Sequence, residues 1–237
     1  MKQYFAHIRR DGSKEQPMGA HLLRVGNLMK EDAARIGLSS LAYLIGVLHD
    51  LGKCSEEFAD YLDWCHKHPE DNSRKGTVDH SSAGGQFLMQ CYGRRGDSAL
   101  LTVHIATLVI FSHHTGLMNY LGEDGVSDFL RRMEKIDVPE VDLSYYFTHV
   151  LSEADIDKLF EEAVCEFSAL DVKIISYAAE GSEMYYFVWG MVHKLLLSML
   201  VDADRLDSAE FELGEARERV WDTSAIWKDF SDKLEQK

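Results

Sequence analysis

The chain has 237 residues, of which 46% are hydrophobic and 27% are charged, so it can bury a sizeable core as one domain or as one domain with an insertion. Its 40 acidic residues outnumber its 25 basic ones and give a net charge of −15, which excludes a surface coated with phosphate-binding charge. Any nucleic-acid chemistry would need a local site, metal ions or a more basic partner.

The first part of the chain has the apolar spacing of amphipathic helices. Apolar residues recur at intervals of three and four from Met18 onward, and Gly37 is placed to end this helix. Ser39-Ser40 offers an N-cap for a second helix. That helix runs into the string His49-Asp50-Leu51-Gly52-Lys53, where Gly52 is placed to break or bend it.

The next segment predicts three more helices. A short helix covers residues 54–70, and residues 71–76 form a polar loop. Another helix starts near His80, and its two glycines, Gly84 and Gly85, would let a neighbouring helix approach closely. From Ser98 a strongly apolar helix leads to the string His113-His114-Thr115-Gly116.

The second half begins less regularly. Residues 117–150 predict a lid or insertion that carries a short helix. Ser152 to Asp155 resembles a capping box in front of a further helix, and residues 184–204 predict a long helix that is apolar on one side. A last helix, over residues 214–236, is predicted to dock on the core. Because no β alternation appears, the chain is predicted to be all-α, with its core over about residues 18–208.

Three absences suggest the compartment. The four cysteines include no CxxC pair and predict reduced thiols. The N-terminus has no apolar run of signal-peptide length, and the stretch taken as most apolar, residues 99–111, is shorter than a bilayer span. We therefore expect a cytoplasmic protein without a membrane partner.

Metal-binding side chains stand at helix ends or on apolar helices in five places. They are His21, His49-Asp50, His80, His113-His114, and Asp204 or Asp202. Divalent metals bind imidazole and carboxylate, and a helical bundle supplies such ligands from facing helices. Neighbours lie about 100° apart around a regular helix, so His49 and Asp50 reach one site only if the helix ends there.

A single histidine on an apolar helix is usually a packed core group, so the whole pattern matters more than any member. On this basis His104 and His193 are assigned to the core. Four other histidines are assigned to the surface: His7, His66, His68 and His149. Asp204 continues the apolar face of its helix and is preferred to Asp202, while Asp207 and Asp124 are expected to be solvated.

The string Leu48 to Lys53 resembles the HDxxGK signature of the HD-domain metal-dependent phosphohydrolases, with His21 matching their first histidine. Within that superfamily the chain is most similar to the HD nuclease of type I CRISPR interference, in the form encoded apart from its helicase. The further matching elements are His80-Ser81-Ser82-Ala83-Gly84, Ser112-His113-His114-Thr115-Gly116-Leu117 and Ala203-Asp204-Arg205-Leu206-Asp207-Ser208. The resemblance covers about residues 18–208.

The resemblance implies an all-α HD-domain bundle with two adjacent divalent metal ions. One ion would be held by His21, His49, Asp50 and Asp204, and the other by His80, His113 and His114, with Asp50 bridging both. So many imidazoles suit Mn²⁺, Fe²⁺, Co²⁺, Ni²⁺ or Zn²⁺ better than Mg²⁺. Asp50 and Lys53 are the catalytic candidates. Lys53 would donate to the scissile phosphate or hold a carboxylate, unless it is a solvated helix-end lysine, and Ser208 would support Asp204.

The leading functional hypothesis is a nuclease that hydrolyses single-stranded DNA, with RNA left open, beside a separate CRISPR helicase subunit and a crRNA-guided surveillance complex. The partner would separate the strands, because the sequence has no GxxxxGKS or GxxxxGKT string. The alternative is an HD phosphohydrolase of nucleotides or cyclic nucleotides, which would not need all of His80, His113 and His114. A third hypothesis, a degenerate fold that serves only as an interaction module, conflicts with the intact ligand set.

Local contacts could still help to bind a strand. The candidates are the pairs Arg94-Arg95 and Arg131-Arg132 and the aromatic residues Tyr120 and Trp64. Arginine pairs of this kind are more often ordinary exposed faces, and packing is the preferred interpretation for Trp64. Stacking of bases on aromatic rings is the alternative.

Overall fold

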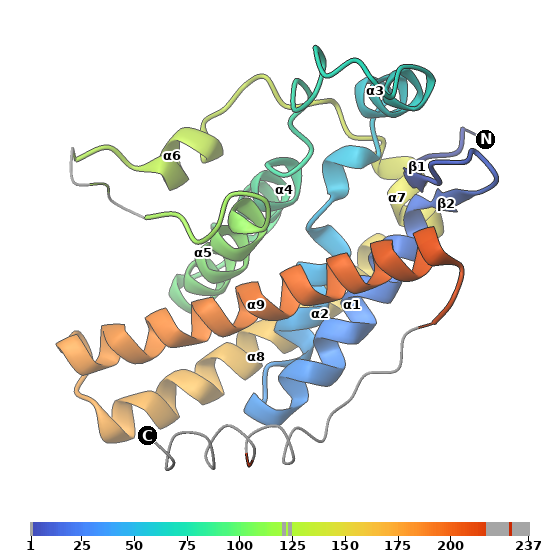
Figure 1. Cartoon of the computed structure of the whole chain (residues 1–237). Coiled ribbons are helices and arrows are strands. Elements are labelled where there is room, and N and C mark those ends of the chain that lie inside the picture. The colour runs from blue at the N-terminus through green and yellow to red at the C-terminus, as the bar shows by residue number, and fades with distance from the viewer. Residues whose placement is uncertain (1, 120–121, 123–124, 217–227, 229–237) are drawn as a thin grey trace, which may run out of the picture.

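A computed structural model describes residues 2–119, 122, 125–216 and 228. Within these residues the fold is a helical bundle with one small sheet (Figure 1), which confirms the all-α prediction apart from a single hairpin. The helices are α1 (Met18–Ala33), α2 (Ser39–Leu48), α3 (Glu56–Lys67), α4 (Ala83–Tyr92), α5 (Asp97–Ser112), α6 (Asp128–Met133), α7 (Leu143–His149), α8 (Glu153–Tyr177) and α9 (Glu183–Leu213), with 3₁₀ turns at Ala34–Ile36 and Leu51–Lys53. Nearly all of the predicted helix 214–236 lies outside the described residues.

The pair α1 and α2 forms the centre of the bundle, with α8 and α9 packed against it (Figure 1). Both helices are buried along most of their length because they carry apolar residues on the faces that meet. They cross at two glycines: a Cβ atom added to Gly46 would lie 2.6 Å from Cα of Gly26. Only glycine at this crossing lets the two backbones approach so closely.

We expect Gly46→Ala to lower the free energy of unfolding by about 1–3 kcal/mol, because the added methyl group overpacks this crossing. Urea or thermal unfolding of the whole chain measures the effect. Gly190→Ala is the matched control, since a Cβ atom there would meet nothing within 4 Å and alanine favours the helical state. Equal destabilisation by both substitutions would contradict the role assigned to the crossing.

The one sheet is an antiparallel hairpin of β1 (Phe5–Ile8) and β2 (Glu15–Pro17), which the sequence analysis did not predict. Its strands have only 4 and 3 residues, too few to show a period of two. Tyr4 and Ala6 are buried in the core, and the amide of Met18 donates to the Tyr4 carbonyl. The hairpin thus packs on the start of α1 and belongs to the core.

The N-terminus of α2 is capped differently from the prediction. Ser39 is the first helical residue, Leu38 takes the N-cap position, and no side chain of either caps the helix. Instead the carboxylate of Glu166, on α8, accepts the backbone N–H of Ser40 at 2.8 Å and of Leu41 at 3.0 Å. A distant acidic side chain therefore satisfies the free N–H groups and complements the positive end of the helix.

Residues 117–150 contain two short helices instead of the one predicted. Helix α6 stands apart from the main bundle beside the end of α5 (Figure 1) and is anchored by the buried Phe129. Helix α7 buries Tyr145 and Tyr146 in the core. Only the part of the predicted insertion before α7 therefore lies outside the main bundle. Ser152 is confirmed as the N-cap of α8, with its Oγ accepting the N–H of Asp155. The Asp155 carboxylate accepts the Ser152 hydroxyl, so only one of the two bonds of the predicted capping box is among the described hydrogen bonds.

By length and composition α9 could cross a membrane. The sequence analysis missed this because it took residues 99–111 as the most apolar stretch. In the structure 17% of the apolar window of α9 is buried, and α9 contacts α1, α2, α5 and α8 in the bundle. Its last turns also bring Asp204 and Asp207 against His21 of α1.

Candidate metal centre

The pair His49-Asp50 lies just beyond the end of α2. His49 keeps helical backbone angles, whereas Asp50 leaves them with φ −113° and ψ 26° before the 3₁₀ turn. The helix therefore ends where the sequence analysis required. The role of Gly52 differs from the prediction, because a Cβ atom there would lie 2.5 Å from the carbonyl oxygen of His80. Glycine at this position lets the segment that carries His80 approach Asp50.

The first group of metal-binding side chains comes from three helices. It consists of His21 on α1, His49 and Asp50 after α2, and Asp204 on α9. One ligand atom from each residue lies within 4.8 Å of the others. Nε2 of His21 lies 3.7 Å from Oδ2 of Asp50 and 3.5 Å from Oδ1 of Asp204. The choice between the two aspartates thus falls on Asp204, since Asp202 lines a separate groove beside Asp32 and Arg35.

The second group shares Asp50 with the first. It adds His80, from the segment before α4, and His113 and His114, from the end of α5. Oδ1 of Asp50 lies 3.7 Å from Nε2 of His80 and 3.4 Å from Nε2 of His113. Nε2 of His114 lies 2.8 Å from Nε2 of His80. One oxygen of Asp50 therefore faces each group.

Several of these ligand atoms are buried and make no hydrogen bond to the described residues. They are Nε2 of His21, His49 and His113 and Oδ1 of Asp50. Buried polar atoms without a partner are rare, and each costs about 1–3 kcal/mol. Here they converge on two neighbouring points, and their chemistry, imidazole nitrogen with carboxylate oxygen, is that of divalent transition-metal ligands. The residues present fit two such ions.

The opposite ring nitrogens explain why the Nε2 atoms point inward. Nδ1 of His49 donates to the Gly46 carbonyl at 2.7 Å, and Nδ1 of His113 donates to the Ile110 carbonyl at 2.6 Å. Each bond places the proton on Nδ1 and leaves the lone pair of Nε2 directed into the site. The turn of helix that precedes each histidine thus fixes its ring.

His21 is oriented by a side chain that the sequence analysis placed in solvent. Asp207 is only 6% exposed, and its Oδ2 lies 2.6 Å from Nδ1 of His21 and accepts Nε2 of Gln16 at 2.7 Å. The expectation of a solvated Asp207 was therefore wrong. Its position one helical turn after Asp204, on the same face, was the signal that could have identified it.

Two neighbours of this carboxylate also differ from the predictions. Ser208 does not support Asp204: its Oγ lies 3.0 Å from Nε2 of His7. His7, predicted at the surface, packs beside His21 with ring centroids 5.2 Å apart. Burial, with a smaller contribution from the charge of Lys53, lowers the pKa of His7 to about 3.

Lys53 is buried and not solvated. Its Nζ lies 2.7 Å from Oδ2 of Asp50, and its side chain is 7% exposed. Burial alone would raise the pKa of the Asp50 carboxyl, but the ammonium of Lys53 holds that pKa well below its usual value. Lys53 therefore keeps Asp50 ionised.

Two histidines of the second group, His80 and His114, are held in the form that binds metal. Burial lowers the pKa of His80 and of His114 to about 4 each. Both are consequently neutral at neutral pH, as a ligating imidazole must be. Whereas His21, His49 and Asp50 are fully buried, His114 is exposed. The centre therefore opens to solvent on the side of His114.

The other candidates within the described residues lie outside both groups. His104 and His193 line an apolar cavity between α5, α8 and α9, while His66 and His68 are exposed. His149 is exposed, as predicted, and its ring stacks on Tyr145. Arg95 pairs with Asp157 on α8, and Trp64 lies beneath Arg74. Tyr120 and Asp124 lie outside the described residues.

A family model described as "Cas3, HD domain" matches residues 14–210. The matched range begins beside β2 and ends within α9, so it includes both groups of metal-binding side chains as well as Gln16 and Asp207. A search of curated proteins finds no match to the chain.

Proposed function

Because the chain belongs to the family of Cas3 HD domains, metal-dependent phosphohydrolases of the CRISPR kind, we propose that it hydrolyses single-stranded DNA at the centre around Asp50. The observation that carries the proposal is that the two oxygens of this carboxylate face different sets of histidines. Oδ2 faces His21 and His49, and Oδ1 faces His80 and His113. A carboxylate shared in this way is the expected bridge of a two-metal phosphodiesterase.

The proposed ligands follow the two groups. His21, His49 and Asp204 would hold one ion, and His80, His113 and His114 the other, with Asp50 shared between them. When bound, two divalent ions supply Lewis acidity and stabilise the charge that develops on a phosphoryl group. Five imidazoles and two carboxylates favour Mn²⁺, Fe²⁺, Co²⁺, Ni²⁺ or Zn²⁺ over Mg²⁺.

The chain's own residues would prepare this site before substrate arrives. Lys53 keeps Oδ2 of Asp50 ionised from within the core, so its ammonium positions the bridge; contact with the scissile phosphate would be a further role. Carbonyl oxygens of α2 and α5 hold the protons of His49 and His113 on Nδ1. The burial of His21, His49 and Asp50 strengthens the charge interactions among them, while the side chains of His80, His114 and Asp204 keep a partly exposed side.

The acidic surface, which repels phosphate, indicates that a partner would bring the DNA strand to this domain. With a net charge of −15, the domain would have weak affinity of its own for a DNA strand. We therefore propose that a helicase subunit and a crRNA-guided surveillance complex deliver the strand in the cytoplasm. The alternative function, hydrolysis of nucleotides or cyclic nucleotides, would leave the group of His80, His113 and His114 unexplained.

A direct test offers the purified protein, with Mn²⁺ or Ni²⁺, either circular single-stranded DNA or a panel of nucleotides and cyclic nucleotides. Cutting of the circle supports the proposed nuclease. Phosphate release from nucleotides alone would favour the alternative. If metal-replete purification yields protein without bound metal by elemental analysis, the interaction-module hypothesis gains instead.

We expect the activity that is recovered after chelation to depend strongly on which metal ion is added back. Protein stripped with EDTA should regain activity with Mn²⁺, Co²⁺ or Ni²⁺ and remain at least about 10-fold less active with Mg²⁺, since imidazole nitrogen is a poor ligand for Mg²⁺. Added transition metal should also raise the melting temperature, because it binds the folded state. Full recovery with Mg²⁺ alone would contradict the assigned ligands.

A further inference from the structure

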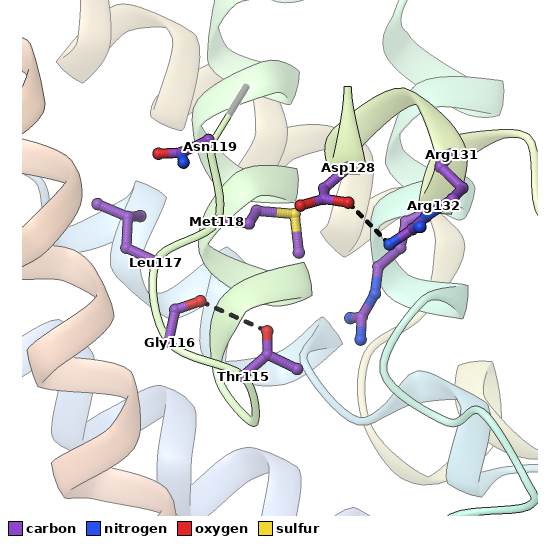
Figure 2. A pocket seen from close by; sticks show the side chains of 8 residues that line it. All are labelled: Thr115, Gly116, Leu117, Met118, Asn119, Asp128, Arg131 and Arg132. Carbon is purple, nitrogen blue, oxygen red and sulfur yellow. Dashed lines mark hydrogen bonds and ion pairs between the residues drawn. The ribbon is translucent and has the colours of Figure 1, made fainter. Parts of the chain in front are cut away.

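A cavity of about 310 Å³ lies between the segment that follows His114 in the chain and α6 (Figure 2). One wall is the segment Thr115–Asn119, which directly follows His114 in the chain. The facing wall is α6, which contributes Asp128, Arg131 and Arg132. None of these residues belongs to the two metal-binding groups.

The cavity is built onto the segments that carry the histidines. Nη1 of Arg132 donates to the carbonyl oxygen of Phe111 at 2.6 Å and to Oγ of Ser81 at 3.0 Å. Phe111 lies two residues before His113, and Ser81 directly follows His80. Arg132 therefore fastens α6 to both segments of the second group, so the cavity and the centre keep a fixed relation.

The lining suits one nucleotide unit. Leu117 and Met118 offer apolar surface, and Thr115 and Asn119 offer polar groups. Arg131 supplies a guanidinium whose side chain is 74% exposed, and it reaches the rim from α6 (Figure 2). A volume near 300 Å³ is at the small end of ligand sites, which matches a single sugar, base and phosphate better than a larger ligand.

We propose that this cavity binds the nucleotide next to the cleaved phosphodiester of a single-stranded nucleic acid, with Arg131 contacting its phosphate. The inference rests on the proposed function and names the position of the strand relative to the centre. Since the centre opens beside His114, a strand whose phosphodiester reaches the metal-binding groups has its neighbouring unit over the segment that begins at Thr115. In a chain of net charge −15, arginines at this opening supply the local positive charge that a strand needs.

An ion pair between Arg131 and Asp128 would compete with a bound strand, so the proposal predicts opposite effects for substitutions of the two residues. Arg131 Nη2 pairs with Oδ1 of Asp128 at 2.7 Å, as the dashed line in Figure 2 shows. A phosphate at the rim must compete with this carboxylate for the guanidinium. Removing the charge of Asp128 should therefore strengthen binding, and removing Arg131 should weaken it.

The experiment measures steady-state cleavage of a short single-stranded DNA by the full chain with Mn²⁺, over a range of salt concentrations. Arg131→Ala should raise KM about 10-fold with little change in kcat, and reduce the slope of log affinity against log salt by about 0.7, the loss of one phosphate contact. Asp128→Asn should lower KM. Arg95→Ala is the matched control, because Arg95 forms a similar exposed pair with Asp157 at 3.0 Å.

A second substrate separates the subsite from the centre. Bis(p-nitrophenyl) phosphate has a single phosphate and lacks the neighbouring phosphate that Arg131 would contact, so Arg131→Ala should raise KM for DNA much more than KM for this ester. Equal effects on the two substrates, or unchanged KM for DNA in both the Arg131 and Asp128 variants, would overturn the subsite while leaving the nuclease intact. Wild-type protein inactive on both substrates would refute the proposed function itself.

Discussion

Asp50→Ala is expected to reduce DNA cleavage by on the order of 10³-fold or more, since residues that act as one catalytic unit lose most of the rate together. The reason lies in the position of Asp50 between the two groups. It is the one residue common to both among the described residues, and each of its oxygens faces a different set of histidines. Its loss would remove the bridge, whereas the loss of a single histidine leaves one group intact.

The measurement combines a nuclease assay with elemental analysis and circular dichroism. Asp50→Ala should retain the helical spectrum of the wild type, because the helices around it are held by apolar contacts of α1, α2, α8 and α9. It should carry less than the two metal ions per chain proposed for the wild type. Asp202→Ala is the matched control: it lies on α9 two residues before Asp204, outside both groups, and should keep its activity and its metal. Full activity of the Asp50 variant would refute the mechanism.

Variants of the first and of the second group test separately whether each group holds one metal ion. His21→Ala removes a side chain of the first group alone, and His113→Ala removes one of the second alone. Each should lower the metal content by about one ion, whereas Asp50→Ala affects both. Loss of the same single ion in all three variants would point to a centre with one metal and to the nucleotide-hydrolase alternative.

The part of the site that the sequence predicts is the part encoded locally. The seven proposed ligands stand at helix ends or on apolar helix faces, which singled out five places along the chain. The resemblance to HD nucleases then implied the two ligand sets, and the structure brings all seven side chains into two adjoining groups. The ending of α2 at His49 follows from the same local signals. The preference for Asp204 followed from the apolar face of α9, which is also a local property.

What the sequence analysis missed depends on contacts between distant parts of the chain. Glu166 caps α2 from α8, and nothing near residue 39 reveals it. His7 and Gln16 lie on strands too short for periodicity to detect, yet the hairpin places both beside His21 and Asp207. Gly52 was noticed for its effect on the helix, whereas its absent Cβ makes room for the backbone of His80. Such partnerships are fixed by tertiary packing, which single-sequence patterns do not report.

Asp207→Asn is expected to weaken metal binding at the first group by about 10–100-fold, the usual cost of losing the partner of a ligating histidine. Oδ2 of Asp207 holds the proton on Nδ1 of His21 and thereby directs Nε2 toward Asp50 and Asp204. The negative charge of the carboxylate also strengthens this hydrogen bond. Asparagine preserves the shape and one acceptor oxygen but removes that charge, so affinity should fall while the fold is kept.

Titration of metal-free protein with Mn²⁺ or Ni²⁺ by calorimetry measures this directly, and saturating metal should restore much of the cleavage rate. Asp207→Ala is the harsher variant, because it leaves Nδ1 of His21 and Nε2 of Gln16 buried without an acceptor, at about 1–3 kcal/mol each. Ser208→Ala is the control, as its bond goes to His7 and not to a ligand. Wild-type affinity in Asp207→Asn would show that His21 needs no carboxylate. Weak affinity that melting data trace to unfolding would assign Asp207 to the core, whereas weak affinity in a folded chain makes it the positioning residue of the first metal site.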